Sequence, residues 1–462
     1  MSNVCFDPDL MRRYDRDGPR YTSYPTAVQF REGLAPDLYE RTVRCSRGAQ
    51  ERSPLSIYVH IPFCSSPCFY CGCNKVVTRQ MGRADEYWRQ LTAEISMRGE
   101  YFDRTRPVEQ LHFGGGTPTF LPPHRLSGLI DALARNFQLT DSAARDYSIE
   151  IDPRTVDTAF LRQIRSLGFN RISLGVQDFD PDVQHAINRV QPPDLVGDLL
   201  ELARGFGFGS INFDLIYGLP RQSTSTFAAT LERVAEMRPD RLAVYGYAHM
   251  PQIFKAQRQI IRSELPDAAT RLALLQLAVN RLTAAGYVYI GMDHFALPAD
   301  GLAQAQKNGT LQRSFQGYTT HASRDLVSLG VSAIGQVGEL YIQNEKTLAK
   351  YGEAVDAGRL PAHRGVVMSE DDMLRKDVIQ QIMCHGIIDL PATERRFGIE
   401  FDRYFDAALP RLRTLQSDGL IDRDETRISL TARGRLLMRN VAMAFDAYVD
   451  PAVAQPQMSR VI

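Results

Sequence analysis

Residues 56–73 read SIYVHIPFCSSPCFYCGC, a β-like run that is followed at once by four closely spaced cysteines. These are Cys64, Cys68, Cys71 and Cys73. A disulfide framework spreads its cysteines to close long loops, and it belongs mainly to small secreted domains. Clustered thiols in a long chain without a secretory-type start instead indicate metal ligands or redox chemistry. The stretch therefore predicts a thiolate site at the C-terminal end of a strand.

The spacing of these cysteines favours an iron–sulfur cluster over zinc. Structural zinc sites usually take two ligand pairs that lie a dozen or more residues apart. Here Cys64, Cys68 and Cys71 follow a C-x3-C-x2-C pattern within one short loop. Such a loop can hold three irons of a [4Fe–4S] cube and leave the fourth iron open to a ligand from outside the protein. Structural zinc and packed thiols are the alternative interpretations.

From about residue 55 onward, short β-like runs alternate with stretches of helical patterning. The runs are 56–61, 110–115, 147–152, 171–176, 210–218 and 241–247. Strands that alternate with helices predict a parallel sheet, and six such units predict a whole or partial (β/α) barrel.

The polar residues of these runs share one face of each strand. Parallel strands that are buried on both faces usually read as continuous apolar runs. Here Ile149 and Ile151 alternate with Glu150 and Asp152, and residues two apart lie on the same face. If helices cover the apolar faces, the polar faces line the barrel interior. The pattern therefore predicts a cavity for a polar ligand rather than a packed lumen.

Residues 114–119 read GGGTPT and follow the second run directly. Glycine lets a ligand approach the backbone closely and adopts positive φ without strain. A glycine run by itself is equally typical of a plain turn. Its place, on the strand after the cysteine loop, favours a ligand-binding segment.

The composition of the 462 residues excludes several classes of partner. Lys+Arg and Asp+Glu number 54 each, so the formal net charge is +0. A nucleic-acid binder normally shows a basic excess. No apolar run approaches the roughly 18 residues of a membrane span. We therefore expect a cytoplasmic protein that binds neither nucleic acid nor a membrane.

We expect three units along the chain. Residues 1–50 form an irregular arm with one short helix, and residues 51–362 form the barrel with an extension that is mainly helical after residue 250. In residues 363–462, Ser369 with Asp372 three positions on predicts a capping box. Residues 409–445 then read as helix, β-ribbon and helix, which is winged-helix-like. Their mild charge favours a packing domain or lid over DNA binding.

Nine segments together resemble the oxygen-independent coproporphyrinogen III oxidases (dehydrogenases) of the radical S-adenosylmethionine superfamily. They are RYDRDGPRYTSYPTA (13–27), YVHIPFCSSPCFYCGCNK (58–75), HFGGGTPT (112–119), SIEIDPR (148–154), RISLGVQDFD (171–180), NFDLIYGLP (212–220), MPQIFKAQRQI (250–260), RSFQGYTT (313–320) and LGVSAIG (329–335). The resemblance runs from the arm past residue 330, and the C-terminal unit also fits it.

The resemblance implies an α/β fold: a partial (β/α)6 TIM-like barrel of the radical SAM type, with an N-terminal arm and a mainly helical, winged-helix-like C-terminal domain. It implies oxidative decarboxylation of two propionates of coproporphyrinogen III to vinyl groups, which gives protoporphyrinogen IX in haem biosynthesis. The implied cofactors are a [4Fe–4S] cluster and two molecules of S-adenosylmethionine, which act through a 5′-deoxyadenosyl radical. A flavodoxin or ferredoxin would donate the electron to a monomeric, cytoplasmic enzyme.

The resemblance also carries residue roles onto matching positions. Cys64, Cys68 and Cys71 would hold the cluster, Cys73 would be needed for activity without being a ligand, and His60 would support catalysis beside the cluster. Around the cluster-bound S-adenosylmethionine it places Tyr58, Gly115, Glu150, Ala248 and Ile334. Around the second molecule it places Tyr70, Gly116, Thr117, Gln177, Arg189 and Asp214.

The chemistry of these side chains agrees with those roles. Glu150 can pair with a methionyl ammonium, Asp214 can accept hydrogen bonds from ribose hydroxyls, and Arg189 can bind a carboxylate through two hydrogen bonds. Tyr70 stands where some relatives carry Phe, and both present an aromatic face. His60 alternatively is a core histidine that is hydrogen-bonded within the barrel.

Three arginines of the arm, Arg13, Arg16 and Arg20, leave two interpretations open: solvated surface charges, or direct contacts to the propionates of a tetrapyrrole. Two other functions also stay open. A related haem-binding chaperone keeps the three-cysteine loop but lacks the fourth cysteine and the Arg/Tyr arm, both of which this chain has. A haem-opening radical methyltransferase is the second alternative.

Overall fold

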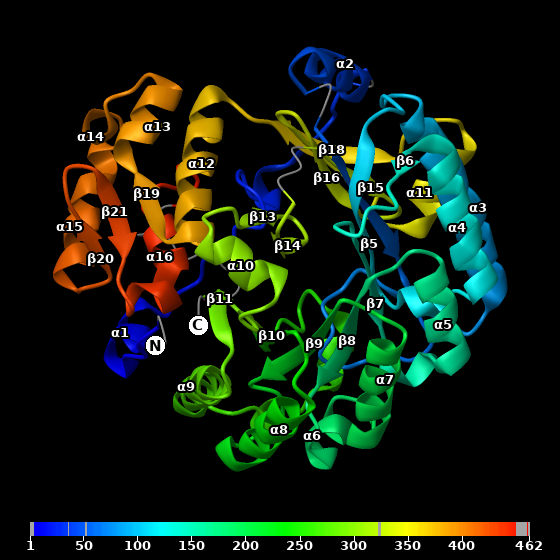
Figure 1. The fold of residues 1–462 in the computed structure, drawn as a ribbon, viewed down its shortest axis with the longest axis horizontal. Coiled ribbons are helices and arrows are strands. Elements are labelled where there is room, and N and C mark those ends of the chain that lie inside the picture. The colour runs from blue at the N-terminus through cyan, green and yellow to red at the C-terminus, as the bar shows by residue number, and fades with distance from the viewer. Residues whose placement is uncertain (1–3, 36, 51–52, 322–324, 450–459, 461–462) are drawn as a thin grey trace.

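The centre of the computed structural model is a parallel sheet. Its strands, in spatial order, are β2 (Leu55–Ile61), β5 (Pro107–Gly115), β7 (Asp146–Ile151), β8 (Arg171–Gln177), β9 (Ser210–Tyr217) and β10 (Arg241–Gly246). All six strands that the sequence predicts are therefore confirmed (Figure 1). The structure describes residues 4–35, 37–50, 53–321, 325–449 and 460. The expected start of the barrel at residue 51 and the end of the last unit at residue 462 lie outside the described residues.

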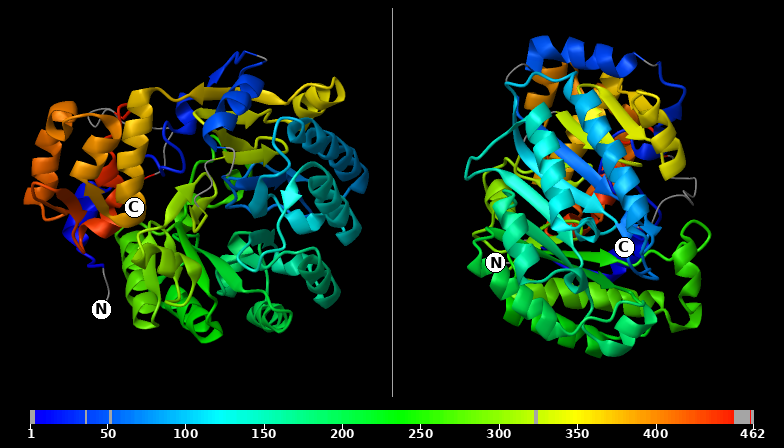
Figure 2. Two further views of the ribbon diagram at one scale, coloured as in Figure 1. Left: turned by 45° about the horizontal axis from the view of Figure 1, so that its top comes forward. Right: turned by 90° about the vertical axis from the view of Figure 1, so that its right-hand side faces the viewer.

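Helices connect the parallel strands and cover their outer face (Figures 1 and 2). They are α3 (Met81–Gly99), α4 (Pro123–Asn136), α5 (Thr158–Ser166), α6 (Pro181–Ala186), α7 (Pro193–Gly205) and α8 (Thr224–Met237). Local sequence sets where they begin. Asp157 accepts a hydrogen bond from the Phe160 backbone at the start of α5, and Ser223 forms a capping box with Thr226 at the start of α8.

The sheet continues beyond these six strands on both sides without closing among the described residues, and the next strand beside β2 is also parallel to it. On one side β15 (Asp325–Leu329) pairs with β2, and β16 (Ile334–Val337), β17 (Leu340–Asn344) and β18 (Ala362–Val367) follow it. On the other side β12 (His294–Ala296) pairs with β10, and β11 (Val288–Gly291) with β12. Because the two ends of the sheet do not pair with each other within the described part of the chain, the barrel is partial, as predicted.

The expectation of a mainly helical extension after residue 250 is wrong. The helices α9 (Ala268–Ala284), α10 (Gly301–Lys307) and α11 (Leu348–Asp356) share this stretch with eight strands, β11 to β18. Each strand has only three to six residues and sits next to a tight turn, such as the one at Gly338 with φ +53°. Such short runs carry too few residues for their period of two to show clearly.

The hairpin of β13 (Gln312–Ser314) and β14 (Gly317–Thr319) lies between the C-terminal unit and the barrel strands (Figure 1). Thr319 accepts a hydrogen bond of 2.9 Å from Gln110 Nε2 of β5. Gln380 of helix α12 (Glu370–His385) donates to the carbonyl of Arg313 at 3.0 Å. The hairpin therefore fills the open side of the partial barrel.

The N-terminal arm is more ordered than predicted. It contains the expected short helix, α1 (Pro8–Tyr14), but also the longer helix α2 (Leu38–Gln50), and β1 (Arg31–Glu32) pairs with β18. Tyr14 donates to Asp418 at 2.5 Å, and Tyr21 donates to Asp446 at 2.9 Å. The arm thus ties the C-terminal unit to the far edge of the barrel sheet (Figure 1).

The C-terminal unit lies beside the barrel (Figure 2). It begins with α12, where the predicted capping box of Ser369 and Asp372 is confirmed. The helices α13 (Leu390–Phe397), α14 (Phe401–Tyr404), α15 (Leu409–Ser417) and α16 (Met438–Ala442) surround a sheet of β19 (Ile387–Asp389), β21 (Arg427–Leu430) and β20 (Ile421–Arg423). The predicted order of helix, ribbon and helix is confirmed.

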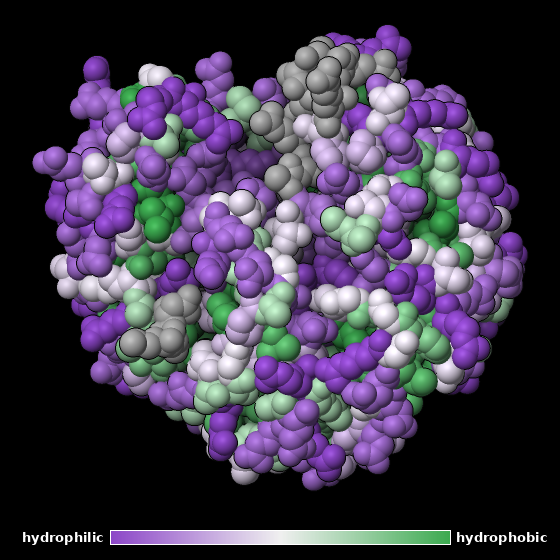
Figure 3. All heavy atoms as spheres, in the orientation of Figure 1, coloured by the Kyte–Doolittle hydropathy of each residue, from purple (hydrophilic) through white to green (hydrophobic). Residues whose placement is uncertain are grey.

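Hydrophilic residues cover most of the face that Figure 3 shows, and hydrophobic residues appear there in small groups. In the described part of the chain no helix has both the length and the apolar character that crossing a membrane requires.

A fully buried ion pair on α3 connects three elements of the barrel. Arg98 Nε lies 3.2 Å from Glu94 Oε1, and Arg98 Nη2 donates to the Asn344 side chain at 2.7 Å. The other oxygen of Glu94 accepts from Tyr351 and from the Gly330 backbone, both at 2.7 Å. Neither charged side chain is exposed, so each depends on the other for compensation.

We predict that Glu94→Ala lowers the free energy of unfolding by about 3–5 kcal/mol, because Arg98 is left as an uncompensated buried charge. Chemical denaturation monitored by circular dichroism measures this change. Glu86→Ala, at an exposed position of the same helix, is the control and should change stability by about 0.5 kcal/mol or less. Equal midpoints for the two variants would contradict the role of the pair.

Candidate active site

The cysteine loop follows the end of β2 and passes through the two-residue strands β3 (Phe63–Cys64) and β4 (Val76–Val77). Cys64 and Cys68 are buried, Cys71 is half-buried and Cys73 is exposed. All four line one cavity of about 400 Å³. The structure therefore brings together the four thiols that the sequence singled out.

Each of the three predicted ligand sulfurs faces a hydrogen-bond donor. Thr117 Oγ1 lies 3.5 Å from Cys64 Sγ, and Arg189 Nη1 lies 3.6 Å from Cys68 Sγ. The backbone N–H of Cys73 donates to Cys71 Sγ at 3.4 Å. Donors around sulfur stabilise thiolates, and a thiolate is the form that binds metal.

The environment separates the acidities of the thiols. A hydrogen bond from the Cys73 side chain, helped by Lys75, lowers the pKa of Cys71 to about 5 against the opposing effect of burial. Burial raises the pKa of Cys64 to about 11. Of these two thiols, Cys71 therefore has the environment that favours the thiolate more strongly.

The donor set fits an iron–sulfur cluster better than a single ion. Within the described residues, no three Cys, His, Asp or Glu side chains are placed to hold one metal ion together. A cluster makes a different demand, because each thiolate binds a separate iron. Three thiols spread along one loop, each with a donor beside it, meet that demand.

The glycine run allows β5 to approach the cysteine loop. Gly115 has φ +116°, and a Cβ there would lie 2.5 Å from His60 Cε1. A Cβ on Gly116 would lie 2.7 Å from the Pro62 carbonyl. The Gly115 N–H donates to Glu150 Oε2 at 3.1 Å. Only glycine fits at either position, and the exposed backbone faces the cavity.

His60 lies behind the cysteine loop and forms a hydrogen bond to its backbone. Its Nε2 lies 3.0 Å from the Asn74 carbonyl, which can only accept, so Nε2 carries the proton. Tyr58 then donates to Nδ1 at 2.9 Å. Burial lowers the pKa of His60, so the ring is neutral at pH 7. This geometry gives His60 a positioning role toward the loop, and its proposed support of catalysis stays a prediction.

Two carboxylates, Glu150 of β7 and Asp214 of β9, line the cavity. Glu150 Oε1 lies 3.2 Å from His112 Nε2. Asp214 accepts from Ser173 Oγ and from Asn212 Nδ2, both at 2.9 Å. Burial and then the nearby Glu150 raise the pKa of Asp214 to about 6. The pair suits a cationic or hydroxyl-bearing ligand, since such a ligand would relieve the repulsion.

Arg189 approaches the cysteine loop from the segment between α6 and α7. It donates to Asp152 Oδ2 at 2.9 Å and to the Gly175 carbonyl at 2.7 Å. Its Nε has no partner among the described residues. Gln177 lies beside it with φ +67°, where the register of β8 shifts. Such strain at a cavity wall is typical of a ligand site.

The cavity brings together most of the predicted site residues. Besides the four cysteines, its lining includes Tyr70, Gly115, Gly116, Thr117, Glu150, Gln177, Arg189 and Asp214. Four predicted residues do not line it within the described part of the chain: Tyr58, His60, Ala248 and Ile334. Tyr58 stacks on the lining residue His112 at 5.8 Å, and Ile334 packs with Phe30, Tyr341 and Met368.

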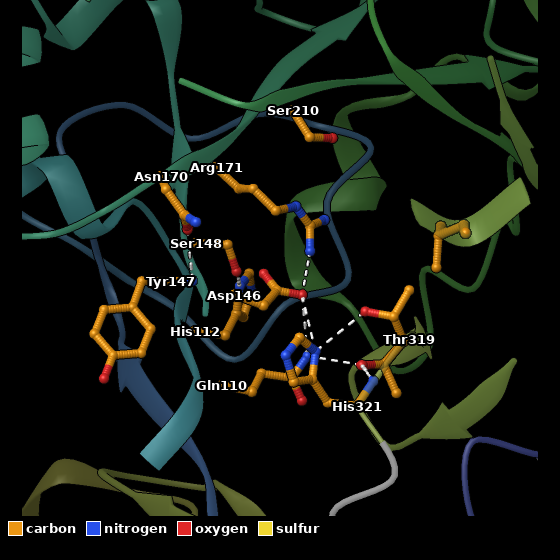
Figure 4. A network of polar contacts seen from close by, with 12 residues as sticks. Gln110, His112, Asp146, Tyr147, Ser148, Asn170, Arg171, Ser210, Thr319 and His321 are labelled. Carbon is orange, nitrogen blue, oxygen red and sulfur yellow. Dashed lines mark hydrogen bonds and ion pairs between the residues drawn. The ribbon is translucent and has the colours of Figure 1, made fainter. Parts of the chain in front are cut away.

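Sequence reasoning missed the polar residues deeper in the lumen, which Figure 4 shows around Asp146. Arg171 pairs with Asp146, and His321 Nδ1 lies 3.9 Å from it. His112 donates to, or accepts from, Ser148 Oγ at 2.7 Å. The period-two pattern of the strands could have found Arg171 and His112, because each shares a face with predicted cavity residues.

A thiolate loop at the end of the first strand of an open barrel, above a polar lumen, defines the radical SAM class. Residues 58–234 match the radical SAM superfamily, and residues 368–437 match the HemN C-terminal domain. A solved structure described as coproporphyrinogen III oxidase (HemN) from Escherichia coli, a radical SAM enzyme, superposes with a TM-score of 0.92. It is 45% identical, and the match covers 97% of this chain and 100% of that one.

Curated relatives with the name oxygen-independent coproporphyrinogen III oxidase match this chain along its full length. The oxygen-independent coproporphyrinogen III oxidase of Pseudomonas aeruginosa is 50% identical over 462 residues, which is 100% of both chains. The enzyme of the same name from Escherichia coli is 46% identical, again over 100% of both chains. The chain belongs to the family of oxygen-independent coproporphyrinogen III oxidases.

We predict that Cys64→Ser, Cys68→Ser and Cys71→Ser each lose most of the iron and sulfide after anaerobic reconstitution, because each removes one thiolate ligand. Iron analysis and the visible absorbance measure this. Cys73→Ser should keep the cluster and lose turnover, and Cys5→Ser, at an exposed position outside the loop, is the control. Full iron content in any of the first three variants contradicts the ligand set.

We predict that nucleoside binding weakens as the pH falls through about 6, because protonation removes the acceptor charge of Asp214. Calorimetric titration with S-adenosylhomocysteine between pH 5 and pH 8 measures this. Asp214→Asn should bind about tenfold more weakly at pH 7.5 and lack the step near pH 6. Identical pH profiles for both proteins would remove Asp214 from the nucleoside site.

Proposed function

We propose that the chain converts coproporphyrinogen III to protoporphyrinogen IX by oxygen-independent oxidative decarboxylation of two propionates. One observation carries this proposal: a loop with three ligand-type cysteines and a fourth beside them opens into a cavity that also contains Glu150, Arg189 and Asp214. The likeness along the whole chain to oxidases of this name supports it.

Cys64, Cys68 and Cys71 would hold a [4Fe–4S] cluster with one iron left for S-adenosylmethionine. When bound, the cluster and S-adenosylmethionine supply the one-electron chemistry that breaks an unactivated C–H bond of a propionate, which no side-chain base can do. The protein binds, orients and shields the reactants. In this scheme Cys73, whose backbone N–H donates to Cys71 Sγ at 3.4 Å, would stay outside the set of ligands.

The cavity walls offer separate partners for the parts of two nucleosides. Glu150 faces the backbone N–H of Gly115, where a methionyl ammonium would find both a carboxylate and the glycine carbonyls. Asp214, with Ser173 and Asn212 behind it, can accept from ribose hydroxyls. Arg189 is directed by Asp152 toward the cysteine loop, where it can bind a carboxylate. Tyr70 offers an aromatic face beside them.

The arm supports closure of the site. Arg20 pairs with Asp293 and lies 5.6 Å from the ring of Tyr245, which lines the cavity. Arg13, in contrast, reaches Asp418 of the C-terminal unit at 2.7 Å and is largely exposed. Of the two, Arg20 is the arginine placed for a role near the substrate.

We also propose that the chain works as a cytoplasmic monomer that receives electrons from a flavodoxin or ferredoxin. The barrel strands, the cysteine loop and the β13–β14 hairpin of one chain together line the cavity, which supports a monomer as the working unit. A cluster of this kind requires a one-electron donor of low potential, and both proposed donors are such proteins. The thiols of the loop require a reducing compartment.

The test is anaerobic reconstitution with iron and sulfide, followed by incubation with coproporphyrinogen III, S-adenosylmethionine and a reduced flavodoxin. We expect two CO₂ per substrate and a product with two vinyl groups. Tight haem binding without turnover would indicate the chaperone alternative, and a methylated tetrapyrrole would indicate the methyltransferase. Either result contradicts the proposal.

A further inference from the structure

Four segments from distant parts of the chain border the cysteine loop. Residues 75–83 continue directly from it. Three side-chain hydrogen bonds of 2.7–3.0 Å connect the loop with the other segments: Asn188 donates to the Pro67 carbonyl, Gln257 to the Tyr70 carbonyl, and Asn74 to the Lys346 carbonyl. We call residues 75–83, 187–190, 250–262 and 346–350 the loop rim.

Each predicted cluster ligand has a contact with the loop rim. Val77 is the register partner of Cys64 in the pair of strands β3 and β4. Arg189 Nη1 lies 3.6 Å from Cys68 Sγ, and Lys75 Nζ donates to the Cys71 carbonyl at 3.1 Å. The loop rim is therefore surface-forming structure that directly adjoins all three ligand positions.

The loop rim is basic, although the chain as a whole has a formal net charge of +0. Its four segments contain no Asp or Glu. Two of its basic side chains are engaged, because Lys75 binds the loop backbone and Arg189 pairs with Asp152. The others are exposed and form no ion pair within the described part of the chain: Arg79, Arg83, Lys255, Arg258, Arg262, Lys346 and Lys350. The rim thus concentrates positive charge beside the loop.

Acidic residues next to the rim in the sequence do not cancel this excess. Asp85 already pairs with Arg125 at 2.7 Å, and Glu264 pairs with Arg221 at 2.8 Å. Glu86 is exposed and forms no ion pair among the described residues, so it offsets a part of the excess only.

Exposed apolar side chains gather at the same place. Of the large apolar side chains that are exposed in the described residues, more than half belong to the loop rim, which is less than a tenth of the chain. They are Val77, Met81, Val190, Ile253 and Ile261, each between 40% and 55% exposed. Single exposed apolar residues are ordinary, but a group of them with a polar border marks an interaction surface.

The position of the loop rim suits electron entry. A donor protein cannot enter a cavity of about 400 Å³, so it docks outside and the electron crosses the cavity wall. The rate of electron transfer falls steeply with distance. The surface that adjoins the ligand positions is therefore the one from which transfer is fastest.

We propose that the loop rim is the docking surface for the electron donor, an acidic protein of the flavodoxin or ferredoxin type. This inference rests on the proposed function. The basic side chains steer and orient an acidic partner, and the apolar side chains supply the contact that excludes water. Interfaces for transient electron transfer are small, so a rim of this extent is sufficient. The donor loses one electron and the cluster gains it, and no atom passes between the proteins.

The first test measures donor binding by calorimetry, with the anaerobically reconstituted protein and an acidic flavodoxin at low ionic strength. We expect Kd to rise about tenfold or more in the triple variant Arg79→Glu, Lys255→Glu and Arg262→Glu, because like charges then face each other. Ile253→Ser with Ile261→Ser should also weaken binding but keep its dependence on salt. For the unaltered protein Kd should rise about tenfold between roughly 50 and 300 mM salt.

The matched control is the triple variant Arg135→Glu, Lys307→Glu and Arg403→Glu. These residues are equally exposed and form no ion pair among the described residues, but they belong to α4, α10 and α14 rather than to the loop rim. The change in net charge is identical in the two triple variants. We expect the control to shift Kd by less than about threefold, since its charges lie away from the interface.

The second test replaces the donor by dithionite, a small reductant that needs no docking surface. Turnover of coproporphyrinogen III with reduced flavodoxin should fall in the rim variant, mainly through a higher KM for flavodoxin. Turnover with dithionite, the iron content and the affinity for S-adenosylmethionine should stay within about twofold of the unaltered enzyme, because the cavity is unchanged.

Several results overturn the proposal. Equal Kd values for the rim and control variants do so, as does a Kd of the unaltered protein that does not respond to salt, which also decides if the rim variant does not fold. Self-association that the rim substitutions abolish would assign the surface to a second copy of the chain instead. If the unaltered enzyme fails with dithionite as well, the proposed function fails, and the calorimetric comparison still tests the rim by itself.

Discussion

Charged and polar groups inside a protein cost several kcal/mol of free energy unless they meet partners, and this barrel holds many of them. The barrel meets this constraint by placing its charged and polar side chains on the lumen face of the strands only. Ile57, Val59 and their equivalents face the covering helices and are fully buried, while Glu150, Arg171 and Asp214 face the lumen. The helices, their caps and the apolar strand faces together stabilise a shell around an interior that is not itself a hydrophobic core.

The polar lumen explains why the barrel can remain open. A closed barrel with eight strands is filled by layers of its own branched side chains. Here the space is left for ligands, and the open side is filled by the β13–β14 hairpin, with α12 and the arm behind it. The arm, which is one of these segments, also brings Arg20 to within 5.6 Å of the Tyr245 ring, which lines the cavity. The segments that close the barrel therefore also form part of the site.

The fold of the parallel strands was predictable because each run carries its own signal. The alternation in residues 147–152 identifies both the strand and its polar face, and Ser369 with Asp372 identifies the start of a helix. The later strands were not predictable, since three to six residues between tight turns carry too little periodicity. The arm's second helix was missed for a related reason: residues 38–50 contain only three large apolar side chains, those of Leu38, Tyr39 and Val43.

The candidate site likewise has one part that the sequence predicts and another part that only the structure shows. The cysteine loop and the glycine run are local in sequence, and their spacing alone pointed to the cluster. The open side of the barrel depends on contacts between distant segments: Gln110 meets Thr319 across 209 positions, and Arg313 meets the arm across 292. Nothing within RSFQGYTT indicates that its side chains contact β5 and the arm. Only the folded chain shows that.

The central claim is that three thiolates hold the cluster and leave its last iron for S-adenosylmethionine. Electron–nuclear double resonance on the reduced, reconstituted protein with S-adenosylmethionine labelled with ¹⁵N at the methionyl amine tests this most directly. The account predicts a hyperfine coupling that shows direct bonding between that nitrogen and iron. A cluster without such a coupling, ligated instead by Cys73 as a fourth thiolate, would contradict it.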